Sequence, residues 1–296
     1  MPNFTKISIV TPSFNQSDYL EQTINSVLSQ NYPNLEYIVI DGGSTDNSAE
    51  IIKKYEKDLK YWVSEKDDGH GHALNKGFTQ STGEIMAWLN SDDKYTAWSF
   101  QVVQEIFDKF PHVNWIVGYN GFWNNKGYMT GANRIPVNIY NYLLGSNFWI
   151  QQESTFWRRS LWEKAGGFIS TDNEFMVDGE LWSRFFLHDD LYTVDCILGG
   201  YRFHSKNRAN LNIKACHNEM MKIVSKMKDN SSDEVIDCFN QYVMLSKIEK
   251  FPFGYRLLNS KLGKKHIFPD RFEKMAYKNI YYKDEEWVER RLPFNC

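Results

Sequence analysis

The feature that most constrains the fold is an apolar stretch, residues 85–89, that ends abruptly in polar and acidic residues. Five consecutive apolar residues between Gly83 and Asn90 are typical of a strand buried on both faces, and such strands belong to parallel sheets covered by helices. Ligands of these sheets bind beyond the carboxyl ends of the strands, where Asp92 and Asp93 follow. Adjacent carboxylates repel each other unless a cation neutralises them, so this pair predicts a site for a hard divalent metal ion.

Two earlier apolar strands also end in polar loops. Residues 6–10 lead into Thr11 and residues 37–40 lead into Asp41, with a helical pattern after each loop. Alternating strands and helices predict a parallel sheet, in which the carboxyl ends of the strands lie at one edge. The alternative for residues 90–93 is a surface turn, because Asn, Ser and Asp favour turns. The convergence of three polar strand ends weakens that alternative.

Composition narrows the class of protein. The 296 residues are 42% apolar, which is enough for a packed core, and the net charge of −3 argues against a nucleic-acid-binding protein. The four cysteines form no C-x-x-C pair, which indicates neither a zinc site nor a disulfide framework. The N-terminus lacks the pattern of a signal peptide, and the longest uncharged run, residues 135–152, is too polar to span a bilayer. We therefore expect a cytoplasmic protein, and any contact with a membrane would be peripheral, at its inner face.

Seven short motifs follow one another along residues 5–206. They are Thr11-Pro12-Ser13-Phe14-Asn15, residues 40–46, Asn75-Lys76-Gly77, Asn90-Ser91-Asp92-Asp93, residues 153–159, Gly166-Gly167-Phe168 and residues 178–182. In order and spacing they resemble the signatures of family 2 glycosyltransferases, which have the GT-A fold. The resemblance implies an enzyme that moves a sugar, with inversion, from a nucleotide sugar to a hydroxyl of a glycan or lipid-linked acceptor. A UDP-sugar is the favoured donor.

The resemblance also implies the architecture. Residues 1–205 would form an α/β domain of the GT-A type, Rossmann-like, with a mixed, mainly parallel sheet flanked by helices. Residues 206–296 would form a mainly helical extension, since residues 217–227 and 234–244 have helical patterns.

The segment from Ser246 onward has 12 basic and 7 acidic residues, and aromatic residues interleave with the basic ones. Such a composition suits an anionic membrane surface, and a membrane contact would agree with a lipid-linked acceptor. Packing on the catalytic domain, or on the second subunit of a homodimer, is at least as good an explanation. The aromatic residues are Phe251, Phe253, Tyr255, Phe268, Tyr281, Tyr282 and Trp287.

Donor-binding residues follow from the matched motifs. In similar enzymes the first loop and the acidic residue after the second strand hold the nucleoside, which implies Thr11, Pro12, Ser13 and Asp41 here. A buried carboxylate suits a nucleobase N–H, because a charge-assisted hydrogen bond is about twice as strong as a neutral one. The alternative for Asp41 is a turn before the two glycines that follow it. Asn75 is assigned to donor binding from its motif.

The acidic pair is expected to bind Mn²⁺ or Mg²⁺, which would offset the charge that builds on the leaving nucleoside diphosphate. The resemblance implies that Asp92 and Asp93 serve this ion, with Asp93 as the direct ligand. His204 is implied as a third metal ligand and Lys206 as a phosphate contact. The alternative for these last two residues is a solvated loop.

Transfer to a hydroxyl needs a base on the acceptor side. Asp178 matches the acidic motif that supplies this base in inverting relatives, with Glu180 as a substitute or an acceptor contact. The alternative for Asp178 is a helix N-cap, which also requires such a residue. Arg158 and Arg159 are candidates for the diphosphate or the acceptor, although surface charges need no function.

Two other segments carry polar or aromatic side chains. His70 and His72 lie on a Gly-rich loop, where they are better explained as hydrogen-bonding groups near the donor than as a second metal site. Residues 119–131 are predicted to form a hairpin over the cleft, and their aromatic side chains would either stack on sugar rings or form a hydrophobic lid.

Two other functions share part of this pattern. A sugar-nucleotide pyrophosphorylase would need a Gly-rich, basic first loop for a triphosphate, and the loop from Thr11 to Asn15 has neither glycine nor charge. A non-catalytic carbohydrate-binding or scaffold protein would not need Asp92, Asp93 and Asp178, so their presence argues against a decayed site.

Overall fold

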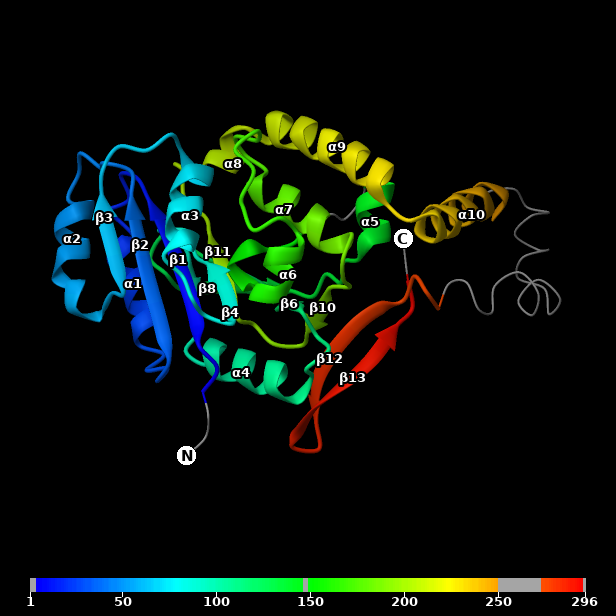
Figure 1. Cartoon of the computed structure of the whole chain (residues 1–296), viewed down its shortest axis with the longest axis horizontal. Helices are drawn as coiled ribbons and strands as arrows, with labels where there is room; N and C mark the ends of the chain where they lie inside the picture. Colours follow the sequence, from blue (N-terminus) through cyan, green and yellow to red (C-terminus); the bar gives the residue numbers. More distant parts are fainter. Residues whose placement is uncertain (1–3, 146–148, 250–272, 295–296) are drawn as a thin grey trace.

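The computed structural model describes residues 4–145, 149–249 and 273–294, in which a nine-stranded sheet forms the centre of the molecule (Figure 1). The order of its strands is β13-β12-β10-β6-β9-β4-β1-β2-β3. Their bounds are Ile7–Ser13 (β1), Leu35–Asp41 (β2), Tyr61–Ser64 (β3), Ile85–Trp88 (β4), Trp115–Val117 (β6), Thr155–Arg158 (β9), Tyr192–Val194 (β10), Tyr277–Lys283 (β12) and Glu286–Leu292 (β13).

Pairing in this sheet is mixed and mainly parallel, as predicted. Strands β1 to β4 pair in parallel, β9 runs antiparallel between β4 and β6, and β10 is parallel to both β6 and β12. Strands β1, β2 and β4 are almost wholly buried and mainly apolar on both faces, whereas the edge strand β3 is partly exposed. The predicted fold class is therefore confirmed.

Helices cover both faces of the sheet and continue along the C-terminal half. Their bounds are Leu20–Leu28 (α1), Ser48–Lys54 (α2), His70–Thr79 (α3), Ser99–Lys109 (α4), Ile139–Leu144 (α5), Arg159–Lys164 (α6), Val177–Phe186 (α7), Arg208–Leu211 (α8), Ile213–Asn230 (α9) and Asp233–Glu249 (α10). Short 3-10 turns lie at Glu56–Asp58 (η1) and Gln152–Ser154 (η2).

The predicted motif Asn75-Lys76-Gly77 lies within α3 and has a structural role. A Cβ atom at Gly77 would lie 2.4 Å from Cγ1 of Val10, so glycine lets the helix approach β1 closely. The side chain of Asn75 donates to the carbonyl of Ile169 and accepts from its backbone N–H, at 2.8 and 2.7 Å. The assignment of Asn75 to donor binding is therefore corrected, since both ends of its amide hold the loop at Ile169.

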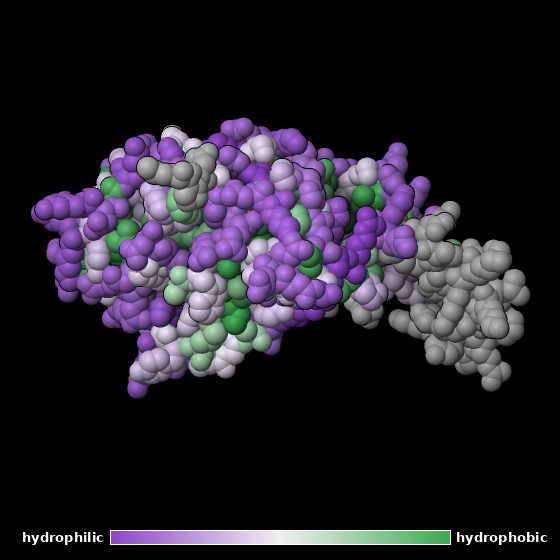
Figure 2. All heavy atoms as spheres, turned by 90° about the horizontal axis from the view of Figure 1, so that it is seen from below, coloured by the Kyte–Doolittle hydropathy of each residue, from purple (hydrophilic) through white to green (hydrophobic). Residues whose placement is uncertain are grey.

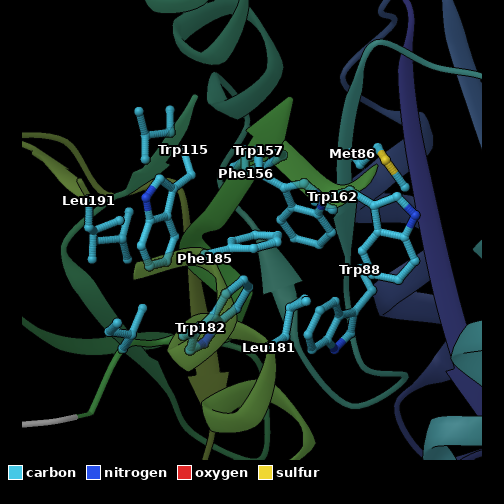
Figure 3. Close-up of a cluster of buried hydrophobic side chains, with 14 of the residues drawn as sticks. Met86, Trp88, Trp115, Phe156, Trp157, Trp162, Leu181, Trp182, Phe185 and Leu191 are labelled. Atoms are coloured by element: carbon cyan, nitrogen blue, oxygen red, sulfur yellow. The ribbon is translucent and has the colours of Figure 1, made fainter. Parts of the chain in front are cut away.

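Aromatic side chains fill the core between the sheet and α7 (Figure 3). Trp182 of α7 stacks on Trp88 of β4, with ring centroids 5.6 Å apart and 12° between the planes. Trp157 of β9 meets Trp182 edge to face, and Trp115 of β6 packs against Phe186. Because these rings belong to both the sheet and α7, they fix the position of α7, whose first turn carries Asp178.

A second, four-stranded sheet lies beside the carboxyl ends of the main sheet. Its order is β5-β11-β7-β8, with bounds Lys94–Tyr95 (β5), Gly199–Arg202 (β11), Asn120–Trp123 (β7) and Met129–Asn133 (β8). Strands β7 and β8 form the hairpin that was predicted within residues 119–131.

The C-terminal segment differs in part from the predicted mainly helical extension. Helices α8 to α10 agree with it, but β12 and β13 form a hairpin that joins the main sheet through β10. Within that hairpin Trp287 is buried, and Arg290 lies over the ring of Tyr281 at 4.0 Å. These two rings therefore pack within the protein, which removes them from the predicted membrane surface. Phe251, Phe253, Tyr255 and Phe268 lie outside the described residues, and the division at residue 205 stays a prediction.

The outer surface is mainly polar. Figure 2 shows a largely hydrophilic face with one area of white and pale green at its lower edge. Across residues 4–145, 149–249 and 273–294, none of the helices has both the length and the apolar character needed to cross a bilayer.

Candidate active site

A cavity of about 630 Å³ lies where the carboxyl ends of β1, β2 and β4 meet. Pro12 and Ser13 from the end of β1, and Asp92 and Asp93 from the turn after β4, line it. Lys206 lines it from the loop after β11. Five of the residues predicted from the sequence are thus brought to one cavity, as parallel strand ends require.

Asp92 and His204 are in direct contact within this region. Nε2 of His204 lies 3.0 Å from Oδ2 of Asp92, and the imidazole side chain is only 2% exposed. Its Nδ1 accepts the backbone N–H of Lys206 at 3.2 Å, which places the ring proton on Nε2, toward Asp92. Tyr19 stacks on the other side of the imidazole with ring centroids 4.6 Å apart. His204 is therefore a firmly held partner of Asp92 and not part of a solvated loop.

Asp93 has a different environment, although it also lines the cavity. Its Oδ1 accepts the backbone N–H of Arg202 at 2.7 Å, and the residue is 1% exposed. Burial, followed by the charges of Glu153 and Asp92, raises the pKa of Asp93 well above its usual value. Burial likewise raises the pKa of Glu153 to about 7. Asp93 and Glu153 thus form a buried acidic pair behind Asp92.

Arg202 links this acidic turn to helix α1. The fully buried side chain donates from Nε to the carbonyl of Asp92, and from NH1 to Oε1 of Gln22 at 3.0 Å. Its guanidinium lies 4.9 Å from the ring centroid of Tyr19, the same ring that supports His204. A buried cation here offsets the charge of the acidic residues and fixes the turn that carries them.

On the nucleoside side, Asp41 is turned away from the cavity. Its carboxylate accepts the backbone N–H of Ser44 at 2.9 Å and the hydroxyl of Ser64 at 2.6 Å. Thr11 likewise uses its hydroxyl on Tyr37, 3.0 Å away. Neither residue lines the cavity. These two side chains therefore support the loops, which corrects their assignment as direct contacts.

Asp67 is the acidic residue that lines this side of the cavity, together with Lys66. It follows β3, so the rule that singled out the ends of the other strands could have found it. Its Oδ1 accepts the backbone N–H of Gly69 at 2.9 Å. A Cβ atom at Gly42 would lie 2.8 Å from Oδ2 of Asp67, so the missing side chain at position 42 makes room for this carboxylate. The Ser13 hydroxyl is buried and has no hydrogen-bond partner among the described residues.

Asp178 lies in the first turn of α7 and does not line the cavity directly. Met176 occupies the N-cap position, and the carboxylate of Asp178 accepts the backbone N–H of Gly179 at 2.8 Å. Burial raises the pKa of Asp178 to about 6. Its charge in turn helps to raise the pKa of Glu153, which places the two carboxylates near each other. Asp178 is therefore not the N-cap of its helix, and it belongs to the acidic group behind the cavity.

Several other candidates have structural partners. Glu180 forms an ion pair with Arg184 at 2.8 Å, so it is not a substitute for Asp178. Arg158 donates to the carbonyl of Val113 at 3.0 Å and to Glu84 at 2.7 Å, and Arg159 donates to the carbonyl of Gly83 at 2.8 Å. Since Arg158 pairs with the first residue of β4, both arginines lie at the edge of the sheet away from the cavity.

The remaining polar groups lie around the opening. Lys206 is 2.9 Å from Asp18, and Arg208 is 3.1 Å from Glu174. Nε2 of His70 lies 3.1 Å from the Asn90 side chain, and burial lowers the pKa of this imidazole.

Metal-binding groups are few. No cluster of three or more His, Cys, Asp or Glu side chains suited to a metal ion occurs in the part of the chain that the structure describes. A second metal site at His70 and His72 therefore has no support, and Asp92 with His204 is a two-residue site at most.

Comparison with known proteins places these features in a family. Residues 8–182 match the model of glycosyl transferase family 2. An uncharacterized glycosyltransferase of Mycobacterium tuberculosis is 31% identical over 206 residues, which is 67% of this chain and 75% of that protein.

Solved structures agree on the fold. The Staphylococcus aureus protein TarS, residues 1–349 in complex with UDP-GlcNAc, superposes with a TM-score of 0.66 at 16% identity, covering 91% of this chain and 80% of that one. The mannosyltransferase PcManGT of Pyrobaculum calidifontis, in complex with GDP-Man and Mn²⁺, gives a TM-score of 0.54 at 16% identity and covers 86% and 83% of the two chains. Since the family model spans more than half of the chain, the protein belongs to glycosyl transferase family 2 and has the GT-A fold of its structural neighbours.

Proposed function

We propose that the protein transfers a sugar from a nucleoside-diphosphate sugar to a hydroxyl of a glycan or lipid-linked acceptor, with inversion at the anomeric carbon. The observation that carries the proposal is the contact of His204 with Asp92, which lines the cavity at the carboxyl ends of the strands. Lys66 and Lys206 line the same cavity and supply positive charge for a diphosphate.

The donor set suits a divalent ion. A carboxylate and an imidazole are ligands that Mn²⁺ accepts, and a diphosphate would complete the coordination that two side chains leave open. We assign Asp92 as the direct ligand, because one oxygen of the 1% exposed Asp93 already accepts the backbone N–H of Arg202. His204 would join Asp92 as a ligand by moving its proton from Nε2 to Nδ1, in place of the bond that Nδ1 accepts from Lys206. Bound there, Mn²⁺ or Mg²⁺ would act as a Lewis acid toward the leaving diphosphate.

Recognition of the nucleoside is assigned to the residues that face the cavity. Asp67 replaces Asp41 as the acceptor of a base or ribose donor, since the Asp41 carboxylate is already bonded to Ser44 and Ser64. The unpaired hydroxyl of Ser13 is a second polar contact for the nucleotide. Phe14, which lines the cavity and is 61% exposed, offers a face on which a base can stack. A UDP-sugar remains the favoured donor.

Asp178 is assigned the role of base. Its pKa of about 6 leaves the carboxylate ionised at neutral pH and still basic enough to take a proton from the attacking hydroxyl. The nucleophilic oxygen then bonds to the anomeric carbon, and the nucleoside diphosphate leaves with its bonding electrons. Glu153 and Asp93, both with raised pKa values, would keep the local negative charge low enough for Asp178 to approach the substrate.

The test is isothermal titration of UDP-, GDP- and dTDP-sugars, with and without Mn²⁺, against wild type, Asp92→Ala and Asp93→Ala. We expect one nucleotide class to bind, and Asp92→Ala to lose about 10- to 100-fold in metal-dependent affinity. Asp229→Ala, an exposed acidic residue on α9, is the control. Binding that ignores both Mn²⁺ and Asp92 would refute the assigned metal site.

Turnover separates transfer from a scaffold function. A transferase releases the free nucleoside diphosphate when acceptor is present, and Asp178→Asn should lower that rate by about 10²- to 10⁴-fold while donor binding is kept. A protein that binds the donor but never releases its nucleotide would be a carbohydrate-binding scaffold.

A further inference from the structure

The four-stranded sheet has one buried face and one face with exposed aromatic rings. Side chains alternate along β11, so Arg202 points to the buried acidic turn while Tyr201 and Phe203, on either side of it, point the other way. On the neighbouring strand, Phe122 pairs with Tyr201 in register, and Trp123 pairs with Arg202. Phe122, Tyr201 and Phe203 therefore share one face, which we name the aromatic face.

The rings of the aromatic face touch one another. Phe122 and Phe203 have centroids 5.6 Å apart and are tilted by 33°, and Tyr201 meets Phe203 edge to face at 5.1 Å. Phe203 is 47% exposed, which leaves much of its ring open to solvent. Trp123 is not available in the same way, since its indole N–H donates to the carbonyl of Lys94 and the ring is buried. The hairpin thus leaves Phe122 half-buried beside Phe203 and keeps Trp123 in the interior.

This aromatic face continues directly into the cavity. Tyr201 both lines the cavity and contacts Phe203. Asp92 and Lys206, which are proposed to serve the donor diphosphate, line the same cavity as Tyr201. A ligand on the aromatic face would therefore border the cavity in which the donor is proposed to bind.

The chemistry of the face favours a carbohydrate. Pyranose rings present flat C–H faces that pack on aromatic rings, while their hydroxyls need polar partners at the edge. The exposed ammonium of Lys206, which lines the adjoining cavity and lies 2.9 Å from Asp18, supplies such a partner. We infer that Phe122, Tyr201 and Phe203 form a subsite on which a pyranose ring of the acceptor stacks during transfer. The inference rests on the proposed function, because it identifies the acceptor by this ring.

The experiment measures saccharide binding separately from donor binding. Saturation-transfer NMR is recorded with the methyl α- and β-pyranosides of glucose, galactose, mannose and N-acetylglucosamine, with and without UDP. We expect at least one glycoside to receive saturation on the C–H protons of one ring face, and Phe203→Ala to weaken its binding by about tenfold. Phe203→Tyr keeps the ring and should stay within about twofold of wild type.

Phe168→Ala is the matched control, because Phe168 has the same 47% exposure but lies over Arg184 outside the aromatic face. It should leave glycoside binding unchanged. UDP affinity is measured for every variant, so a chain that binds glycosides but no nucleotide would reject the proposed function and keep the subsite.

Two outcomes would overturn the subsite. One is that no glycoside binds the wild type, or that Phe203→Ala binds as well as wild type. The other is binding to vesicles of phosphatidylcholine and phosphatidylglycerol that depends on Phe203 in the absence of glycoside binding, since the aromatic face would then be a membrane contact.

Discussion

At the scale of single residues, we expect nucleotide binding to depend on the space around the Asp67 carboxylate as much as on its charge. At Gly42 a methyl group would lie 2.8 Å from the Asp67 carboxylate, which must then move away. We expect Gly42→Ala to weaken nucleotide binding by about tenfold or more, because a hydrogen bond to a charged group contributes about 1.5–3 kcal/mol. Isothermal titration checks this.

The change at position 42 should have little effect on folding, since a flexible side chain absorbs the contact. Gly131→Ala is the matched control, because a Cβ atom there meets nothing within 4 Å. If Gly42→Ala lowered the unfolding temperature strongly and left nucleotide affinity intact, the close approach would matter for packing and not for Asp67.

Asp178 has opposite effects on activity and stability. Its folded pKa of about 6 lies above the ordinary value of 3.8, so the folded state binds more protons between these pH values. Stability therefore falls as the pH rises through this window, while kcat should rise toward a plateau above pH 6. We expect Asp178→Asn to melt at a higher temperature than wild type at pH 8, with the difference fading below pH 4. Thermal melts at several pH values check this, and a lower melting temperature at pH 8 would contradict it.

Several site residues could be predicted from the sequence because strand ends of a parallel sheet must share an edge. That rule brought Asp92 and Asp93 to the cavity, and the motif resemblance added Ser13 and His204. Neither the strand-end rule nor the motif resemblance predicts the direction in which a side chain points. Asp41 lies at the expected strand end, but nearby hydroxyl groups satisfy its carboxylate and turn it from the cavity.

Among the secondary-structure elements, the C-terminal hairpin was the one that sequence reasoning missed. Two-residue hairpin loops usually carry Asn-Gly or Asp-Gly, because both loop positions need positive φ. Here the loop is Asp284-Glu285, with φ angles of 49° and 65°. A glutamate in that conformation gives no hairpin signal, so the sequence predicts a mainly helical extension here, with a membrane contact or packing on the catalytic domain or a second subunit as alternatives.

The same loop supports a prediction. Glycine adopts positive φ without a steric cost, so Glu285→Gly should stabilise the folded protein by about 0.5–1 kcal/mol. Lys283→Gly is the contrast, since Lys283 pairs within β12 and glycine weakens strands. Denaturant unfolding measures both. Equal effects of the two substitutions would mean that the loop conformation carries no strain.

For the whole molecule, the order of strands in the main sheet determines which segments depend on one another for stability. The hairpin, at the end of the chain, adds to β10, which pairs with β6, and β9 joins β6 to β4 beside the cavity. For this part of the chain the sequence predicts a mainly helical extension. The sheet order instead predicts that loosening the hairpin destabilises the catalytic core.

Asn279 provides the most direct test, because it is buried in β12, the strand that joins the C-terminal hairpin to β10 of the main sheet. It donates to the carbonyl of Thr193 at 2.7 Å and to Asp195 at 2.8 Å, and its own oxygen accepts from Arg134 and Arg290 at 3.1 and 2.6 Å. Asn279→Ala should cost about 1–3 kcal/mol, because it leaves the carbonyl of Thr193 without this donor, while Arg134 and Arg290 keep their ion pairs with Asp195.

The measurement is urea unfolding followed by two probes, far-ultraviolet circular dichroism and UDP binding. If the hairpin belongs to the cooperative unit, both transitions of Asn279→Ala shift to lower urea together. Lys283→Ala, at an exposed residue on the same strand, should shift them little. The transitions could instead separate, with UDP binding lost at the same urea concentration as in wild type. The hairpin would then unfold alone, and the stability of the core near Asp92 would not depend on it. A joint shift would show that nucleotide binding depends on strands that lie at the far end of the sheet.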